Sequence, residues 1–322
     1  MVKIIAEFCQ NHNGDFNILK NMIHKAAESG ATHAKIQTIY AKNLSFRPEF
    51  EEEIFYDGSQ LSIKRPYKAE FERLKNLEIN LDDSKKFISL CKEYNLVPMT
   101  TCFSRSNIKE IISAGFKSIK VASYDCASFP LIRELKEVFD EIIVSTGASF
   151  DDEIKNTANI LNDTNFSFLH CVTLYPTPLD QMHLSRLNWL RKFTPNVGLS
   201  DHTLFERDGI KASLGALALG AEIIERHFTI LPSNKTKDGP VSIDSSSLKS
   251  ISDFAKLSID ERIKKINSIF PNWKVMLGQS KRKLTSQELL NRNYYRGRFA
   301  SPREGFSNGE AMIFNWEETP LG

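Results

Sequence analysis

The chain has 322 residues, of which 41% are hydrophobic and 25% are charged, a balance typical of a folded globular protein. The 42 basic and 40 acidic residues nearly cancel, which argues against nucleic acid or an anionic membrane surface as the main partner. A local basic pocket for a phosphate stays open. No apolar run approaches the length of a membrane span, and the N-terminus reads as a first strand rather than a signal peptide.

The cysteines indicate a reducing compartment. There are 5 of them, an odd number, at wide spacings and without a CxxC pair. This usage favours the cytoplasm, where structural disulfides are rare. We expect most of the thiols to be small buried residues. They are Cys9, Cys91, Cys102, Cys126 and Cys171.

Short runs rich in strand-forming residues recur along the chain, and most precede an amphipathic stretch with helical spacing. Runs such as KIIAEF and EIIVST are nearly continuous in apolar residues, as strands buried on both faces should be. Eight strand-then-helix units within about 250 residues predict a (β/α)₈ TIM barrel rather than an open doubly wound sheet. The predicted strands are 3–8, 33–38, 97–102, 118–123, 141–146, 166–171, 197–202 and 222–228. The predicted helices are 17–29, 82–94, 108–114, 130–138, 152–161 and 208–219.

Two segments depart from the repeating unit. Residues 39–81 show no clear strand and one short helical pattern near 69–77. An insertion of this length after the second strand favours a binding loop or lid over a plain surface excursion. A last helical pattern ends near Ile269, and the remaining residues read as a tail with scattered turns. We therefore expect a barrel over 1–270 and a C-terminal extension over 271–322.

Polar residues gather at the carboxyl ends of the predicted strands, where barrel enzymes build their active sites. Lys35 and Lys120 lie in otherwise apolar strands. An unpaired ammonium group is costly to bury, so two of them on one rim predict a bound anion. Glu7, Asp125 and Glu225 are candidate acids, bases or ion-pair partners of these lysines, and their spacing does not decide between the roles.

Two histidines, His202 and His227, end neighbouring predicted strands. Imidazoles placed in this way can share a divalent metal and leave positions open for water and substrate. The alternative is that one histidine is a general base and the other is structural. Spacing alone leaves both interpretations open.

Several segments between residues 4 and 229 resemble the sialic acid synthase family, in the family's order. They are IAEFCQNHNGD, AKIQT, TTCFSR, IKVASYD, IVSTGA, LHCVTLYPTP, VGLSDHT and EIIERHFT. The segments LHC…YPTP, GLSDHT and ERHFT are together specific for the family. The resemblance implies condensation of phosphoenolpyruvate (PEP) with an N-acetylmannosamine-like sugar aldehyde. The implied product is a 2-keto-3-deoxy sugar acid, with phosphate released by C–O cleavage.

The resemblance also implies a set of site residues. His202 and His227 would hold a divalent metal, Mn²⁺ before Mg²⁺ or Co²⁺. The catalytic candidates are Glu7, Lys35, Asp125, Tyr175 and Glu225. The candidates for PEP binding are Thr101, Lys120, Ser123, Ser145 and Ser200. The candidates for contact with the acceptor sugar are Gln37, Asp125 and Tyr175, and Asp125 stands where the family usually has a longer Glu.

The implied chemistry suits these residue types. Lysines and hydroxyl donors can position an anion such as PEP, whose C3 attacks the aldehyde carbon. A metal would polarise the aldehyde oxygen as a Lewis acid. Water then adds at C2, and Glu7 or Glu225 would take its proton. Two alternatives stay open: a synthase for a shorter or phosphorylated aldose, and a non-catalytic barrel that binds sugar phosphates.

The sequence departs from the family pattern in two places. In TKDGPVSID, Val241 takes the place of the family's usual acceptor-binding Asp, and Asp238 or Asp244 are candidate replacements. The family usually ends in an antifreeze-like domain that enters the partner's site in a swapped dimer. The residues from 291 onward resemble only the first part of that domain.

The shortened C-terminus leaves open which residues recognise the acceptor sugar. Arg296, Arg298 and Arg303 are candidate cations there. The run 291–298 could also pack on the chain's own barrel, and the 39–81 insertion could read the acceptor instead. The expected partners are PEP and an aldose, with neither nucleic acid nor membrane, and a homodimer stays open.

Overall fold

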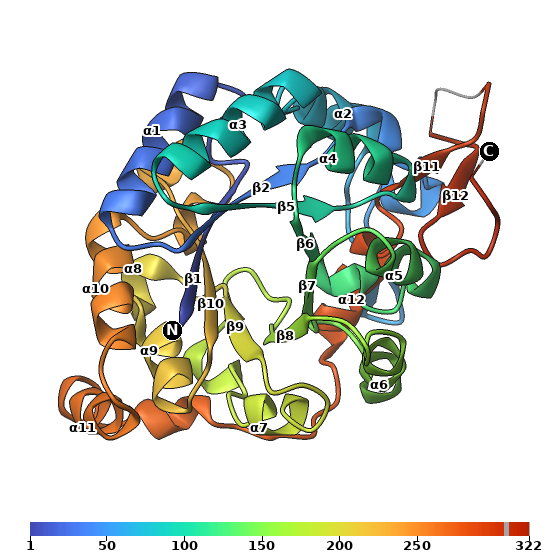
Figure 1. The fold of residues 1–322 in the computed structure, drawn as a ribbon. Coiled ribbons are helices and arrows are strands. Elements are labelled where there is room, and N and C mark those ends of the chain that lie inside the picture. The colour runs from blue at the N-terminus through green and yellow to red at the C-terminus, as the bar shows by residue number, and fades with distance from the viewer. Residues whose placement is uncertain (306–308, 322) are drawn as a thin grey trace.

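The computed structural model describes residues 1–305 and 309–321. Eight parallel strands close into a barrel in the order β1, β2, β5, β6, β7, β8, β9 and β10, with β10 returning to β1 (Figure 1). The predicted (β/α)₈ barrel is confirmed, because each barrel strand falls on a predicted run. The strands are β1 (Lys3–Cys9), β2 (His33–Thr38), β5 (Val97–Cys102), β6 (Ser118–Val121), β7 (Glu141–Ser145), β8 (Phe166–His170), β9 (Val197–Asp201) and β10 (Ile223–His227).

Helices surround the barrel (Figure 1). In α1 the buried residues Leu19, Met22, Ile23 and Ala26 form one stripe at helical spacing, and Asp15 caps the N-terminus. The helices are α1 (Phe16–Glu28), α2 (Tyr67–Lys75), α3 (Leu81–Glu93), α4 (Ile108–Ala114), α5 (Phe129–Lys136), α6 (Asp151–Ile160), α7 (Arg186–Leu190), α8 (Phe205–Asp208), α9 (Lys211–Ala218), α10 (Ser245–Ala255), α11 (Ile259–Ile269) and α12 (Ser286–Tyr295). None of the helices in the described part of the chain is long and apolar enough to cross a bilayer.

The barrel interior changes from apolar to polar along the strands. An apolar layer of Ile5, Met99, Ile143, Leu169 and Ile223 fills its middle. Successive side chains of a strand face opposite sides, so the inward residue two positions further on lies one layer nearer the carboxyl end. In that layer the inward residues are Glu7, Thr101, Ser145, Cys171 and Glu225. The apolar layer therefore forms the floor of a polar chamber.

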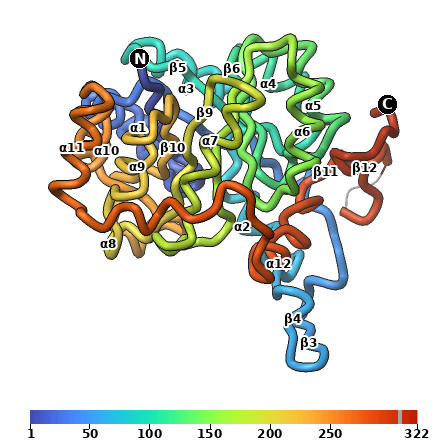
Figure 2. Tube along the Cα trace, turned by 90° about the horizontal axis from the view of Figure 1, so that it is seen from below, coloured from blue at the N-terminus to red at the C-terminus, as the bar shows by residue number. Residues whose placement is uncertain are grey.

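The 39–81 insertion contains a β-hairpin, so the expectation that it lacks a strand was wrong. Strands β3 (Ile54–Tyr56) and β4 (Ser59–Ser62) are antiparallel and project away from the barrel (Figure 2). Asp57 and Gly58 join them with φ of 47° and 72°. An Asp-Gly pair between strand-forming runs is a strong hairpin signal, because both turn positions need positive φ. The expected helix near 69–77 is confirmed as α2.

The tail contains a regular helix, α12, and a two-stranded sheet, so the expectation of scattered turns was wrong there. The sheet pairs β11 (Ala300–Pro302) with β12 (Met312–Phe314). Thr285 and Glu288 form a capping box at the start of α12, a signature visible in the sequence as T-x-x-E. The tail also pairs with the insertion, since Leu44 forms a β-bridge with Phe299. The division at residue 270 stays a prediction.

Candidate active site

The predicted catalytic, PEP-binding, metal-binding and main acceptor-binding residues all line one cavity of about 640 Å³ at the carboxyl end of the barrel. The strands and the loops directly after them supply these side chains, as the fold requires. The predicted residues that it brings together are up to 220 positions apart, from Glu7 to His227. The predicted residues on its wall are Glu7, Lys35, Gln37, Thr101, Lys120, Ser123, Asp125, Ser145, Tyr175, Ser200, His202, Glu225 and His227.

Two carboxylates accompany the two buried lysines. Glu225 lies between them, with its carboxylate oxygens 3.3 Å from Lys35 Nζ and 3.7 Å from Lys120 Nζ. Glu7 forms a second ion pair with Lys35. Burial alone would raise the pKa of Glu225, but the charges of Lys120 and Lys35 outweigh it and hold that pKa well below the ordinary value. The lysines therefore have partners inside the barrel before any substrate anion arrives.

Hydroxyl groups surround the lysine nitrogens. Lys120 Nζ donates to Ser145 Oγ at 2.6 Å, and Lys35 Nζ donates to Thr101 Oγ1 at 3.1 Å. Ser200 Oγ donates to Glu225 at 2.7 Å. Burial lowers the pKa of Lys35 below its ordinary value, and the charge of Glu225 partly offsets this. The result is a compact group of cationic and hydroxyl donors, the kind that binds a small anion.

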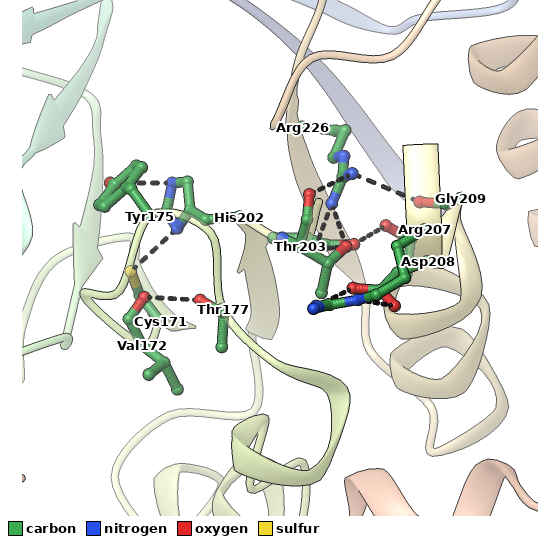
Figure 3. Close-up of polar contacts among 12 residues, drawn as sticks. Cys171, Val172, Tyr175, Thr177, His202, Thr203, Arg207, Asp208, Gly209 and Arg226 are labelled. Atoms are coloured by element: carbon green, nitrogen blue, oxygen red, sulfur yellow. Dashed lines mark hydrogen bonds and ion pairs between the residues drawn. The ribbon is translucent and has the colours of Figure 1, made fainter. Parts of the chain in front are cut away.

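The two histidines face each other across the cavity, with ring centroids 5.3 Å apart. Tyr175 Oη lies 3.0 Å from His202 Nε2, and Cys171 Sγ lies 3.6 Å from His202 Nδ1 (Figure 3). Burial lowers the pKa of both imidazoles, so both are neutral near neutral pH. Neutral imidazole is the form that binds a metal.

A metal-binding geometry is present around His227. One ligand atom each from Cys9, His227 and Asp238 lies within 4.8 Å of the other two. The Nδ1 atom of His227 is buried and has no hydrogen-bond partner among residues 1–305 and 309–321. Imidazole, carboxylate and thiolate are all ligands of divalent transition metals, so these residues fit a divalent metal ion.

The loop after β10 shows which aspartate near Val241 lies close enough to the cavity to replace the family's usual Asp. Val241 is buried and has no carboxylate. Asp244 caps α10 by accepting from Ser247 N at 2.8 Å, so its carboxylate is used there and not in the cavity. Asp238 does line the cavity. Of the two candidate replacements, only Asp238 reaches the site.

Asp125 is held by the far end of the chain. Its Oδ1 accepts from Ser128 Oγ at 2.8 Å and from Asn315 Nδ2 at 3.0 Å. Asn315 also donates to Phe103 O at 2.9 Å. Burial raises the pKa of Asp125 to about 6, although both hydrogen bonds favour its ionised form. Sequence reasoning missed Asn315, because no local pattern connects positions 190 residues apart.

Other polar residues at the same strand ends face away from the cavity. Asp201 and Arg226 form an ion pair that is almost fully buried between the barrel and its helices. Arg226 also donates to Thr203, on the side of the strands opposite to His202 (Figure 3). Neighbouring residues of a strand end, such as Asp201 and His202, therefore point to opposite sides, one to the helices and one to the cavity.

The tail covers the cavity of its own barrel. Asn291 Nδ2 donates to Thr173 O at 2.7 Å, and the ring of Tyr295 stacks on Tyr124 with centroids 5.0 Å apart. Of the three candidate arginines, Arg298 lines the cavity, where it forms an ion pair with Glu70 of the insertion. The alternative that the run 291–298 packs on the chain's own barrel is therefore confirmed.

A TIM barrel with paired lysines, neutral histidines and hydroxyl donors at its catalytic end is the architecture of an enzyme for small anionic substrates. Comparison with known proteins agrees and is more specific. The NeuB family model matches residues 22–259. The N,N'-diacetyllegionaminic acid synthase of Campylobacter jejuni is 32% identical over 260 residues, which cover 76% of this chain and 73% of that protein.

Two further comparisons point the same way. N-acetylneuraminate-9-phosphate synthase of Mus musculus is 27% identical over 252 residues, 75% of this chain and 66% of that protein. The crystal structure of N-acetylneuraminic acid synthetase from Leptospira borgpetersenii superposes with a TM-score of 0.66 at 26% identity, over 91% of this chain and 90% of that one. The chain belongs to the NeuB family, whose members are PEP-condensing synthases.

Proposed function

We propose that this chain is a metal-dependent synthase that joins PEP to an N-acetylmannosamine-like sugar aldehyde. The product is a sialic-acid-like 2-keto-3-deoxy sugar acid, and phosphate leaves by C–O cleavage. The observation that carries the proposal is the single cavity in which two lysines, two histidines and the hydroxyl donors meet. We further propose the cytoplasm as the compartment, where the buried free thiols stay reduced.

In this proposal the lysine and hydroxyl group binds PEP. Lys120 and Ser145, already 2.6 Å apart, donate to its anionic oxygens. Thr101, Ser123 and Ser200 add hydroxyl donors from neighbouring strand ends. Fixing PEP between rigid strand ends aligns its C3 with the acceptor carbon and removes the entropic cost of bringing the two together.

His202 and His227 would hold the metal, which when bound would supply Lewis-acid chemistry for the aldehyde oxygen. Both are neutral and converge in the cavity, and this geometry supports the pair. Mn²⁺ is the metal that we propose first, with Mg²⁺ and Co²⁺ as alternatives. Gln37, Asp125 and Tyr175, which line the same cavity, would contact the acceptor sugar.

The carboxylates divide the remaining work. When C3 of PEP bonds to the aldehyde carbon, water adds at C2, and its proton must pass to a base. Glu225 lies between two lysines that hold its pKa low, which makes it a weak base. We therefore assign the proton to Glu7, which has an ion pair with Lys35 alone among the described residues. The bond from C2 to the bridging oxygen then breaks, and phosphate departs with that oxygen.

A phosphorylated aldose is a second candidate acceptor. Arg65, Lys237 and Arg298 line the cavity from segments outside the barrel strands, where the distal end of an acceptor would lie. Cations there suit a terminal phosphate. One relative is named for a 9-phosphate product.

The test is phosphate release from PEP in the presence of Mn²⁺ across a panel of acceptors. The panel holds N-acetylmannosamine, its 6-phosphate, 2,4-diacetamido-6-deoxy sugars, mannose and short phosphorylated aldoses. We expect release that depends on one acceptor and is lost in His202→Ala. Tight PEP binding without release under any acceptor would contradict the synthase and favour a sugar-phosphate-binding barrel.

A further inference from the structure

We propose that Cys9 and Asp238 are protein ligands of the metal, together with His227. The proposal rests on the proposed function for the presence of a metal. It adds a thiolate and a carboxylate that the predicted pair of histidines does not include.

The three side chains come from three different parts of the rim. Cys9 ends β1, His227 ends the neighbouring β10, and Asp238 lies in the loop that follows β10. Cys9 Sγ is 2.9 Å from Asp238 Oδ2, and each residue has a ligand atom within 4.8 Å of the other two. Ligand atoms around one tetrahedral metal lie about 3–4 Å apart, given metal–ligand bonds of about 2.0–2.3 Å. Small side-chain adjustments therefore suffice to bind a metal.

The surroundings of His227 leave its ring free to bind. The residue is 7% exposed, and its Nδ1 has no hydrogen-bond partner in the described part of the chain. An unsatisfied polar atom in a buried position costs free energy unless something outside the protein satisfies it. Several buried atoms of the described residues share this lack, and His227 differs from them in belonging to the group with Cys9 and Asp238.

The backbone at Cys9 supplies an independent observation. Cys9 has a φ of 45°, in the left-handed region that disfavours any residue with a β-carbon. The pairing of β1 with β2 also shifts register between Glu7 and Cys9. Bulges beside active sites redirect side chains, and strained residues concentrate at ligand sites. The strained backbone at Cys9 turns its thiol into the cavity, where a glycine would adopt the same conformation at lower cost.

A second thiol in the cavity provides a matched control. Cys171 also lines the wall and is buried, but its Sγ lies beside His202 Nδ1 at 3.6 Å. Asp238 contacts Cys9, and the three-residue ligand group does not include Cys171. Both cysteines are therefore buried in the same cavity, but only Cys9 belongs to the candidate ligand group.

A thiolate ligand changes which metals bind best. Soft sulfur ligands favour Co²⁺ and Zn²⁺ over the harder Mn²⁺ and Mg²⁺. Every nitrogen or oxygen site already prefers Co²⁺ to Mn²⁺ to some degree. The informative quantity is therefore the dissociation constant for Mn²⁺ divided by the dissociation constant for Co²⁺. We expect this ratio to be lower in Cys9→Ser than in the wild-type chain.

The deciding experiment is a Co²⁺ titration of the metal-free full chain, followed by near-ultraviolet absorption. We expect a thiolate-to-cobalt charge-transfer band in the wild type and in Cys171→Ser. Cys9→Ser should lose the band and bind Co²⁺ at least about tenfold more weakly. Asp238→Asn should keep the band and bind more weakly. Circular dichroism and thermal melting establish that each variant is folded.

Each outcome bears on the proposal. A band that survives Cys171→Ser identifies Cys9 even if Cys9→Ser does not fold, because of the described cysteines those two line the cavity. A band lost in Cys171→Ser but kept in Cys9→Ser would overturn the assignment, and so would a wild type without any band. The titration needs no turnover. Acceptor-dependent phosphate release without a thiolate band would refute this inference and leave the proposed function standing.

Discussion

The rim of the barrel and the segments that cover it form the same cavity in different ways. The rim consists of the inward residues at the carboxyl ends of the strands, such as Lys120 and Glu225. The cover consists of residues 39–81, 286–305 and 309–316, which contribute Arg65, Tyr295 and Arg298 to the cavity or hold its wall. Rim residues take their positions from strand register, whereas cover residues take theirs from contacts between distant segments.

The difference suggests a division of roles. The rim concentrates buried charge in rigid strands, the environment in which electrostatic stabilisation of a reaction is strongest. The cover contributes aromatic rings, arginines and the amide of Asn315, which line the cavity or hold Asp125, one of the residues proposed to contact the acceptor. We therefore expect rim substitutions to affect chemistry and stability, and cover substitutions to affect the acceptor.

The largest effect should come from Lys120→Met in the rim. The change removes the ammonium that donates to Ser145 and lies 3.7 Å from Glu225. Phosphate release should fall by at least about 10²-fold, as when one electrostatic donor is lost from an active site. Steady-state kinetics with PEP measure the loss. Lys92→Met on the exposed face of α3 is the control and should retain full activity.

Next in size is the stability effect of Glu225→Gln. This change leaves Lys120 buried without the carboxylate that it pairs with. Breaking a buried pair from one side costs about 3–5 kcal/mol, because the remaining charge stays desolvated. Urea unfolding monitored by circular dichroism measures the free energy of unfolding. Glu28→Gln, at an exposed pair with Lys25, should cause no measurable change. If both changes lowered the free energy of unfolding equally, the buried pair in the rim would be no more important for stability than an exposed surface pair.

In the cover, Asn315→Ala should change the pH dependence. Asn315 donates to Asp125, whose pKa is about 6, and donation to a carboxylate favours its ionised form. Losing the donor raises that pKa further, by up to about one unit if the hydrogen bond contributes about 1 kcal/mol. The acid limb of kcat/KM for the acceptor should move to higher pH, while the KM for PEP stays unchanged. Ser128→Ala should shift the limb in the same direction, because Ser128 donates to the same oxygen. An unmoved limb in both variants would show that Asp125 does not act in its ionised form.

The smallest effect should come from the tip of the hairpin. Tyr56 is 74% exposed and belongs to β3, in the hairpin that projects from the barrel (Figure 2). Tyr56→Ser should change the free energy of unfolding by no more than about 0.5 kcal/mol and leave acceptor kinetics as they are. A large rise in the acceptor KM would show that the hairpin closes over the cavity during turnover.

The rim could be predicted from sequence because its signals are local. Near-continuous apolar runs located the strands, and the polar residues at their carboxyl ends, such as Glu7, supplied the site candidates. The predicted site residues therefore share one cavity, although their individual roles stay predictions. Alternation could not have placed Cys9, because the register of β1 shifts between Glu7 and Cys9 and the backbone at Cys9 has positive φ. The cysteines were expected to be mostly small buried residues, and all five are buried, but that expectation did not single out Cys9 and Cys171, which line the cavity.

The cover was predicted less well, for physical reasons. The hairpin had a local signal in Asp57-Gly58, and α12 had one in its capping box, so those two errors were avoidable. The contacts that place these elements were not predictable, since Ser45 N donates to Arg298 O across 253 positions. Pairings at such separation depend on the whole fold and leave no periodic trace in the sequence.

In the proposed reaction, PEP loses phosphate by C–O cleavage during condensation with a sugar aldehyde. The most direct test uses PEP labelled with ¹⁸O at the oxygen that bridges C2 and phosphorus, with the acceptor that gives the fastest release. We predict that the label appears in the released phosphate and that release requires the acceptor. Label retained in the carbon product, or phosphate released equally well without an acceptor, would contradict the account.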